Sequence, residues 1–410
     1  MSKHGPILAV VSDAYLPLVA GVRAAGLDSV VQTDWPNALQ AFDHTPPAAV
    51  IAAAPAEGDA VFKTLATRIA ATQPYVPLIM LDAIASLPIN AIPFSLTESS
   101  ADRLVARLRA ALRIRALHAT MLRRQIDQPS APHPLPVSDP LQDATILLVG
   151  RGASYPALSV ALGAQMGVVG ALSVEAAAKH LNLRDIDGIV IGDGFTARVV
   201  DAFLTVLSED PRFRNLPVVA PSGPERNYDL PNLETINGEP ALIVATVLPL
   251  IRQRAFEQRI HRTLRSIDAG GLLDPRTGLL TPAAFSRDFS NAVKQAQARR
   301  AGLSAARFAF AERHSREQYD AARILGRLMR RTDFATMHDD GSMTAVFVDA
   351  GARNASTIAK RLASVMKYTM HSARRGSHID PHVRVETLTA TDTAASLLAR
   401  LAGETKRAAS

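Results

Sequence analysis

The feature that most constrains this chain is a repeated alternation of apolar strands and amphipathic helices. In residues 6–125, strand-like runs beginning with Ile7–Val11 are separated by stretches whose apolar residues have helical spacing, and a long helix follows. Residues 143–256 repeat this order at a similar length, beginning with Thr145–Val149. Strands that alternate with helices favour a parallel sheet with helices on both faces. The sequence therefore predicts two tandem doubly wound α/β units.

Composition marks the boundaries between units. Gln128–Pro140 contains five prolines in thirteen residues, which favours an extended, semi-rigid linker. A helix predicted from Pro240 to Ile267 carries Pro249 inside it, where we expect a kink or a break. The predicted division is 1–127 for the first unit, 128–140 for the linker, 141–256 for the second unit, 257–272 for a helical connector and 273–410 for a C-terminal domain.

Charge and residue usage narrow the function classes. Cysteine is absent, which excludes disulfides, thiol catalysis and cysteine metal sites. No window approaches the roughly 18 apolar residues of a membrane helix, and the N-terminus lacks a signal-peptide pattern, so we expect a cytoplasmic protein without a membrane partner. Residues 257–410 hold 25 Lys/Arg against 15 Asp/Glu. Either an anionic partner meets this region, or the arginines form a solvated helix surface.

Both α/β units resemble the receiver domains of two-component response regulators. The string Asp-Pro-Arg-Phe-Arg-Asn-Leu-Pro-Val-Val at 210–219 is similar to the run into the fourth strand of a receiver. The resemblance implies a flavodoxin-like fold and phosphoryl chemistry. In that family an acidic pair after the first strand holds Mg²⁺, and an aspartate at the end of the third strand accepts the phosphoryl group.

Both units depart from the receiver pattern at the positions that carry this chemistry. Those positions are Val11, Ser12 and Ala53 in the first unit, and Gly150, Arg151 and Asp193 in the second, whereas Ser222 fits the hydroxyl position of the family. Ala53 offers no carboxylate, Arg151 would repel Mg²⁺, and Asp193 lies one residue beyond the acceptor position. We therefore expect two pseudo-receivers that serve for packing, dimerisation or partner docking.

The C-terminal domain contains the most specific string of the chain. Asp-Pro-Arg-Thr-Gly-Leu-Leu-Thr-Pro-Ala-Ala-Phe at 274–285 resembles the opening of GGDEF domains, the diguanylate cyclase family. From the residues alone, Gly278 marks a turn, Thr281 is a helix N-cap and Pro282 occupies the first helical position. The resemblance implies an α+β domain of the nucleotidyl cyclase type. Two receivers followed by such a domain is the architecture of the PleD type of response regulator.

The signature that gives the GGDEF family its name is lost here. It stands on a β-hairpin, where two glycines let the backbone approach GTP phosphates and an acidic residue serves Mg²⁺. The five matching residues are Asp339, Asp340, Gly341, Ser342 and Met343, and Ala311-Glu312 replaces the second metal ligand. We therefore expect no cyclase activity, no catalytic residue, no metal site and no cofactor.

One binding motif of the family remains upstream of the hairpin. Many GGDEF domains bind cyclic di-GMP through an Arg-x-x-Asp five residues before the signature, and here Arg330 and Asp333 stand at that spacing. A guanidinium can pair with a phosphate or a guanine edge, and a carboxylate accepts from guanine N–H groups. Arg361 stands where family members supply a further arginine. The alternative is that Asp333 only turns the chain into the next strand.

These observations predict a non-catalytic signalling scaffold or adaptor in a two-component or cyclic di-GMP pathway. Its expected partners are other signalling proteins, a second copy of the chain, and cyclic di-GMP at Arg330, Asp333 and Arg361. The alternative is a purely structural module that oligomerises through its receiver faces without a nucleotide. Nucleic acid is disfavoured as a partner because the basic segments lack interleaved aromatic residues.

Overall fold

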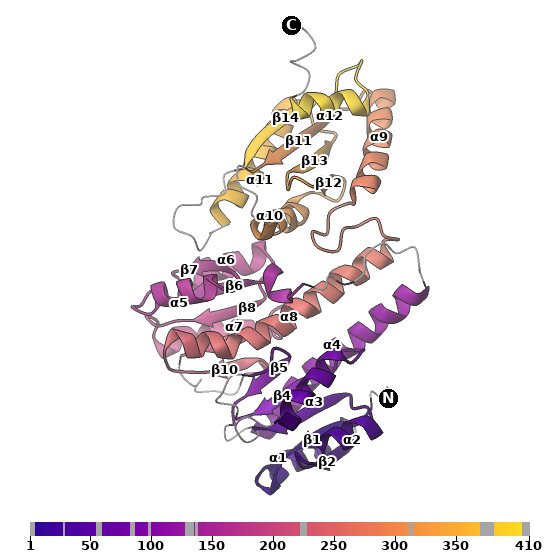
Figure 1. The fold of residues 1–410 in the computed structure, drawn as a ribbon. Helices are drawn as coiled ribbons and strands as arrows, with labels where there is room; N and C mark the ends of the chain where they lie inside the picture. Colours follow the sequence, from indigo (N-terminus) through magenta and orange to yellow (C-terminus); the bar gives the residue numbers. More distant parts are fainter. Residues whose placement is uncertain are drawn as a thin grey trace.

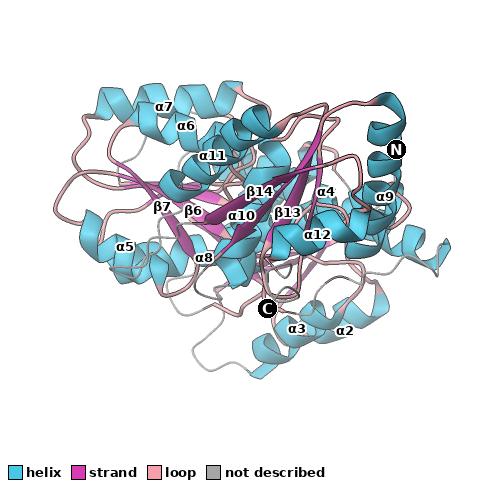
Figure 2. Ribbon diagram, turned by 90° about the horizontal axis from the view of Figure 1, so that it is seen from above, coloured by secondary structure: helices cyan, strands magenta, loops and turns pink. Residues whose placement is uncertain are grey.

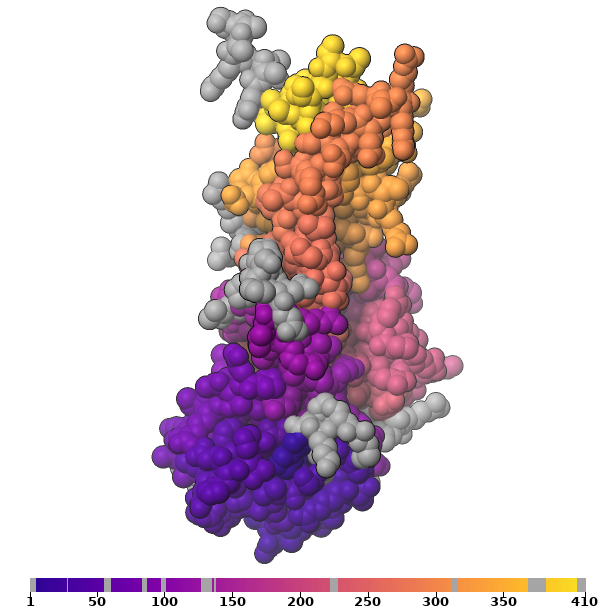
Figure 3. All heavy atoms as spheres, turned by 90° about the vertical axis from the view of Figure 1, so that its right-hand side faces the viewer, coloured from indigo at the N-terminus to yellow at the C-terminus, as the bar shows by residue number. Residues whose placement is uncertain are grey.

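The computed structural model describes residues 5–27, 29–54, 60–82, 87–96, 100–127, 135, 138–221, 228–310, 315–369 and 381–403. They form three units stacked along an elongated molecule, with the N-terminal unit at one end and the C-terminal unit at the other (Figures 1 and 3). In this part of the chain, no helix has both the length and the apolar character required to cross a membrane.

The first unit is a parallel sheet with the strand order β2-β1-β3-β4-β5, which is that of flavodoxin-like folds. Its strands are β1 (Ile7–Val10), β2 (Val30–Thr33), β3 (Ala49–Ala53), β4 (Leu78–Leu81) and β5 (Ala91–Phe94), and its helices are η1 (Asp13–Tyr15), α1 (Leu16–Ala24), α2 (Ala38–His44), α3 (Ala60–Ala71) and α4 (Ser100–Asp127). Alternate β1 residues enter two cores, one lined by α1 and α4 and the other by α2 and α3. The predicted parallel sheet is confirmed.

The second unit repeats this arrangement, with strands in the order β10-β9-β8-β6-β7, all parallel. Its elements are η2 (Pro140–Asp143), β6 (Thr145–Val149), α5 (Tyr155–Gly163), β7 (Gly167–Ala171), α6 (Val174–Leu183), β8 (Gly188–Ile191), α7 (Ala197–Glu209), β9 (Val218–Ala220), β10 (Leu233–Thr235) and α8 (Pro240–Asp268). Helices α6 and α7 cover one face of its sheet and α5 and α8 cover the other (Figure 2).

Helix α8 is continuous through Pro249, so the break considered there does not occur. The residues that flank Pro249 are buried in the cores of two different units. Leu250 packs into the core of the first unit, whereas Val247 and Ile251 pack into the core of the second. Burial of these side chains offsets the hydrogen bond that the proline cannot donate. Since α8 also runs across residue 256, the division drawn there between unit and connector stays a prediction.

The last helices of the two units, α4 and α8, lie side by side (Figure 1). A stripe of apolar residues on α8, which includes Phe256, Ile260 and Leu264, packs against Ile114 and Met121 of α4. This contact joins the first unit to the helix that leads into the third unit.

The third unit is an antiparallel sheet with the strand order β12-β13-β11-β14. Its elements are α9 (Pro282–Arg299), β11 (Leu303–Ala309), α10 (Ser315–Leu328), β12 (Phe334–Met337), β13 (Met343–Val348), α11 (Ala352–Thr369), β14 (His382–Thr387) and α12 (Ala394–Ala402). Helices α10 and α11 cover one face, and α9 and α12 cover the other. As predicted, Thr281 caps α9 by accepting a hydrogen bond from the Ala284 amide, and Pro282 begins the helix.

Candidate functional site

The predicted hairpin is formed by β12 and β13, which pair from Met337 opposite Met343 to Phe334 opposite Val346. At its turn, the Gly341 amide donates to the His338 carbonyl, and the His338 amide donates to the Ser342 carbonyl. Gly341 has a φ of +79°, the left-handed backbone that favours glycine. The geometry of the turn therefore explains why a glycine stands at position 341.

Asp340 is held inside this turn by hydrogen bonds from two partners. Its Oδ1 accepts from the Ser342 amide at 2.9 Å and the Ser342 hydroxyl at 2.6 Å. Its Oδ2 accepts from the Arg307 guanidinium at 2.8 Å. Burial raises the pKa of Asp340, but the bonds from Ser342 and the charge of Arg307 outweigh it, and the pKa is lowered. The carboxylate therefore closes the turn and neutralises an arginine of β11.

The side of Gly341 that a Cβ atom would occupy is filled by Gln318 of α10, whose amide would lie about 2.2 Å from that atom. Gln318 is 6% exposed. The Gln318 amide therefore lies against the backbone at Gly341 and would have to move before a phosphate group could approach on this side. The position that carries the metal-binding acid in the GGDEF signature is this glycine, and the matching Ala311-Glu312 of the other predicted ligand lies outside the described residues.

Arg330 and Asp333 lie in the connection between α10 and β12. Helix α10 ends at Leu328, so the pair follows the helix instead of lying on its last turn. The Asp333 amide donates to the Arg330 carbonyl at 3.0 Å, and Asp333 Oδ1 accepts from the Val348 amide at 3.1 Å. Asp333 thus ties the start of β12 to the end of β13, as the structural alternative predicted.

The Arg330 side chain is exposed, whereas Asp333 is partly buried. Burial raises the pKa of Asp333, against the opposing effects of the Val348 amide and the Arg330 charge. Arg361 is exposed on α11, and among the described residues no hydrogen bond or ion pair joins it to Arg330 or Asp333. The structure therefore brings Arg330 and Asp333 together, and the role of Arg361 in a common site stays a prediction.

The strand pairing also allows the residues of the two units that were compared with the receiver family to be matched with one another. Val10 pairs with Ala52 in the first unit as Val149 pairs with Ile191 in the second, so Ala53 corresponds to Gly192. Asp193 therefore lies one residue beyond the acceptor position, as the sequence indicated. Ser222 lies outside the described residues.

Asp193 accepts hydrogen bonds from the loop that follows β6. Its carboxylate accepts from the Ser154 hydroxyl, and its carbonyl accepts from the Arg151 amide at 3.3 Å and the Gly152 amide at 3.2 Å. The bond from Ser154 is the main reason why the Asp193 pKa is lowered. The Arg151 guanidinium donates to the Gly194 carbonyl and lies over the Phe195 ring. A serine thus binds the carboxylate, the arginine side chain is bound elsewhere in the loop, and the described residues contain no group of three or more His, Cys, Asp or Glu side chains that could hold a metal ion.

The charged contacts between units were not found from the sequence. Arg107 of α4 pairs with Glu234 of β10 at 2.5 Å, and each side chain is only 1% exposed. Arg107 also donates to the carbonyls of Pro93 and Pro231, each at 2.8 Å. Arg107 and Glu234 are 127 residues apart in the sequence. No local spacing relates them, although an arginine on the apolar face of a predicted helix could have marked the position.

A second buried cluster joins the second and third units. Asp143 pairs with Arg259 at 2.7 Å, and its carbonyl accepts from Arg323 of α10 at 3.1 Å. Arg184 of the second unit lies 3.3 Å from Asp320 of α10. Buried ion pairs cost desolvation energy and persist where their geometry is well satisfied. The contact of α10 with the second unit is therefore specified by charge as well as by shape.

Comparisons with known proteins concern part of the chain. No protein-family model matches this sequence, and no curated protein matches it. Among solved structures, the coiled coil and GGDEF domain of DgcB from Caulobacter crescentus, in complex with c-di-GMP, is 16% identical with a TM-score of 0.29, covering 36% of this chain and 84% of that one. The FimX GGDEF domain from Pseudomonas aeruginosa is 18% identical with a TM-score of 0.29, covering 32% and 90%. Diguanylate cyclase SiaD from the same organism, in complex with its activator SiaC, is 14% identical with a TM-score of 0.30, covering 37% and 65%.

Proposed function

We propose that this chain is a non-catalytic signalling scaffold in which two receiver-like units and a degenerate GGDEF-like domain act through protein contacts. The observation that carries the proposal is the state of the hairpin turn. Asp340 is bound to Arg307 and Ser342, and Gln318 lies against the Cβ side of Gly341. The family's chemistry needs open backbone and a free acid at this turn.

The connections between units support a scaffold instead of three independent modules. Helix α8 runs without interruption from the second unit toward the third and packs on α4 of the first. Buried pairs at Arg107–Glu234 and Arg184–Asp320 join the second unit to the units on both sides of it. A partner protein that binds one unit therefore binds an assembly in which the other two units are firmly attached.

Incubation of the full chain with GTP and Mg²⁺ is expected to yield no cyclic di-GMP, measured by chromatography of the nucleotides against a known cyclase as positive control. Arg307→Ala releases Asp340 from its ion pair and serves as the matched variant. It is expected to remain equally inactive, because glycine and serine still occupy the acidic positions of the signature. Formation of cyclic di-GMP by the unmodified chain would overturn the non-catalytic assignment.

The second candidate function is reception of cyclic di-GMP at Arg330 and Asp333, favoured by the exposed guanidinium next to a carboxylate held at the hairpin. Isothermal titration calorimetry with cyclic di-GMP is expected to show saturable heat, with affinity lowered at least tenfold by Arg330→Ala, since a charged hydrogen bond contributes about 1.5–3 kcal/mol. Arg331→Ala, at an exposed variable position of the motif, is the control and is expected to bind normally.

Absence of heat, or an Arg330→Ala variant that binds as tightly as its Arg331→Ala control, would leave the structural alternative. In that case the chain oligomerises through its receiver-like faces without a nucleotide. Light scattering distinguishes the two, because that alternative predicts an oligomer whose mass does not change when cyclic di-GMP is added.

A further inference from the structure

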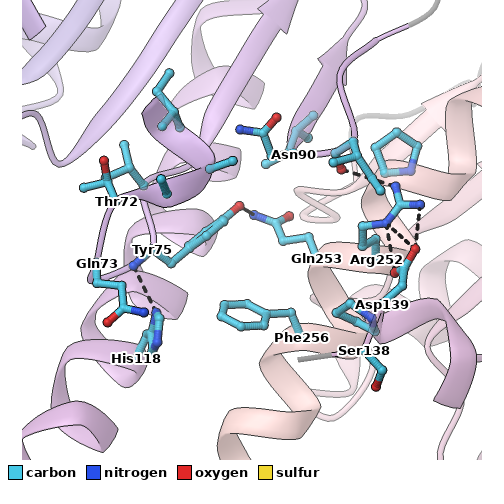
Figure 4. Close-up of a pocket in the computed structure, with 18 residues that line it drawn as sticks. Thr72, Gln73, Tyr75, Asn90, His118, Ser138, Asp139, Arg252, Gln253 and Phe256 are labelled. Atoms are coloured by element: carbon cyan, nitrogen blue, oxygen red, sulfur yellow. Dashed lines mark hydrogen bonds and ion pairs between the residues drawn. The ribbon is translucent and has the colours of Figure 1, made fainter. Parts of the chain in front are cut away.

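A cavity of about 630 Å³ lies where the first unit meets α8 and the end of the linker (Figure 4). One wall comes from the first unit and includes Thr72, Tyr75 and Asn90; the opposite wall comes from α8 and includes Gln253 and Phe256. Ligand cavities in proteins measure about 300–1,000 Å³ and are frequent between domains. Both the size and the position of this cavity are those of a small-molecule site.

The lining is mainly apolar. Ile69, Val76 and Ile92 contribute aliphatic surface, and Phe256 presents an aromatic ring. The Phe256 ring centroid lies 5.4 Å from that of Tyr75, so two aromatic side chains from different units flank the same space. Aromatic walls of this kind favour a planar ring that can stack or meet them edge to face.

The charged and titratable groups at the cavity offer no net charge to a ligand. Arg252 is paired with Asp139 at 3.1 Å and donates to the Ile89 carbonyl. Burial, helped by the nearby Arg115, lowers the pKa of His118, so its ring is neutral and accepts from the Tyr75 amide at 3.0 Å. Burial also raises the pKa of Tyr75, which keeps the phenol protonated. The cavity therefore disfavours an ion.

Polar groups from the two opposite walls meet at the cavity. The Gln253 amide nitrogen donates to the Tyr75 oxygen at 3.2 Å (Figure 4). Within the described residues, the Tyr75 hydroxyl proton and the Gln253 carbonyl oxygen have no hydrogen-bond partner. One donor and one acceptor thus stand side by side next to the apolar wall, an arrangement that fixes the orientation of a ligand.

We propose that this cavity binds a small uncharged molecule consisting of an aromatic ring and one hydrogen-bonding group. The ring lies against Phe256 and the polar group meets Tyr75 and Gln253. Because the walls belong to the first unit and to α8, an occupant stabilises the packing of these two parts. The site is independent of cyclic di-GMP reception, since neither Arg330 nor Asp333 contributes to it.

The experiment uses the full chain and N-phenyl-1-naphthylamine, an uncharged aromatic amine whose fluorescence increases in apolar surroundings. Titration is expected to saturate at one probe per chain and to raise the thermal unfolding temperature. Thr72→Trp places a large side chain at the cavity and is expected to lower the affinity at least tenfold. Thr67→Trp is the matched control: Thr67 is exposed on α3, the helix that ends just before Thr72, and its hydroxyl makes the same kind of hydrogen bond to the carbonyl four residues earlier.

Gln253→Met gives a second readout that does not depend on filling the cavity. It keeps the length of the side chain and removes the amide, so the probe is expected to bind several-fold more weakly while the chain stays folded by circular dichroism. Fluorescence that rises without saturation, or equal affinities in Thr72→Trp, Gln253→Met and Thr67→Trp, would mean that the probe meets only general apolar surface and would overturn the proposal.

Discussion

Replacing Arg107 by methionine is expected to lower the free energy of unfolding of the first unit by about 3–5 kcal/mol, the range for breaking a buried ion pair from one side. Glu234 is 1% exposed and would keep its charge, with only Arg103 left nearby at 3.8 Å. The carbonyls of Pro93 and Pro231 would also lose a donor. Urea unfolding followed by tryptophan fluorescence measures the effect.

The readout is specific because Trp35 is the single tryptophan of the chain and packs against Phe62 in the first unit. Arg124→Met is the matched control. Arg124 stands on the same helix and pairs with Asp268 of α8, but both side chains are about half exposed, so its loss is expected to cost less than about 1 kcal/mol.

A double variant separates the effect of the unpaired buried charge from the effect of lost side-chain packing. Adding Glu234→Leu to Arg107→Met removes the stranded carboxylate, and much of the lost stability is expected to return, because apolar residues can replace a buried pair at little cost. If Arg107→Met unfolds at the same urea concentration as Arg124→Met, the pair does not hold the first two units together.

Asp143→Asn is expected to destabilise the junction between the second and third units by about 3 kcal/mol at neutral pH. Asp143 and Arg259 have side chains about 6% and 4% exposed, and the substitution leaves the guanidinium without its carboxylate. Hydrogen exchange of η2 and α10 peptides, together with thermal unfolding, measures the change. Asp229→Asn is the control, because the Asp229–Arg214 pair lies at the surface.

This effect is expected to depend on pH. Burial raises the pKa of Asp143, but Arg259 and Arg323 outweigh it, so the folded pKa lies below the unfolded value of about 3.9. The stability from Asp143 is complete above about pH 3.9 and is lost as the pH falls through the lower folded pKa. The difference between the unmodified chain and Asp143→Asn should therefore shrink in acid. A difference that is constant from pH 7 to pH 3 would exclude the ionised pair as its cause.

Asp187, which lies near the same junction, changes the stability with pH in the opposite direction. Burial raises its pKa to about 6, against a hydrogen bond from the Thr145 amide. A carboxyl group with a raised folded pKa loses stability as the pH rises from about 4 to 6. Asp187 is present in both proteins of the comparison, so its contribution largely cancels.

Much of the fold could be predicted because it depends on local patterns. The predicted run Thr145–Val149 has the same bounds as β6, since buried parallel strands are continuously apolar. The edge strands β5 and β10 were missed. Each is only three or four residues long, and β5 contains Pro93, which sequence patterns place outside a strand.

The candidate site was predictable only in part. The resemblance to GGDEF domains directed attention to Arg330, Asp333 and the hairpin, and it implied that Asp340 and Gly341 stand at positions of the family signature. It did not show that Arg307 neutralises Asp340, because that contact depends on the pairing of β11 with β13. The cavity between Tyr75 and Gln253 had no signal at all, since its walls are brought together by packing of separate units.

The residue pattern was enough to predict the three-unit order, the parallel sheets of the first two units and the difference between Asp339–Met343 and the GGDEF signature. These follow from residue type and spacing along the chain. Only the tertiary structure decided that the hairpin turn is closed by its own side chains, that α8 continues through Pro249, and that buried charges lock the units together. The physical reason is distance along the chain: Arg107 and Glu234 exert no effect on each other until folding removes both from water.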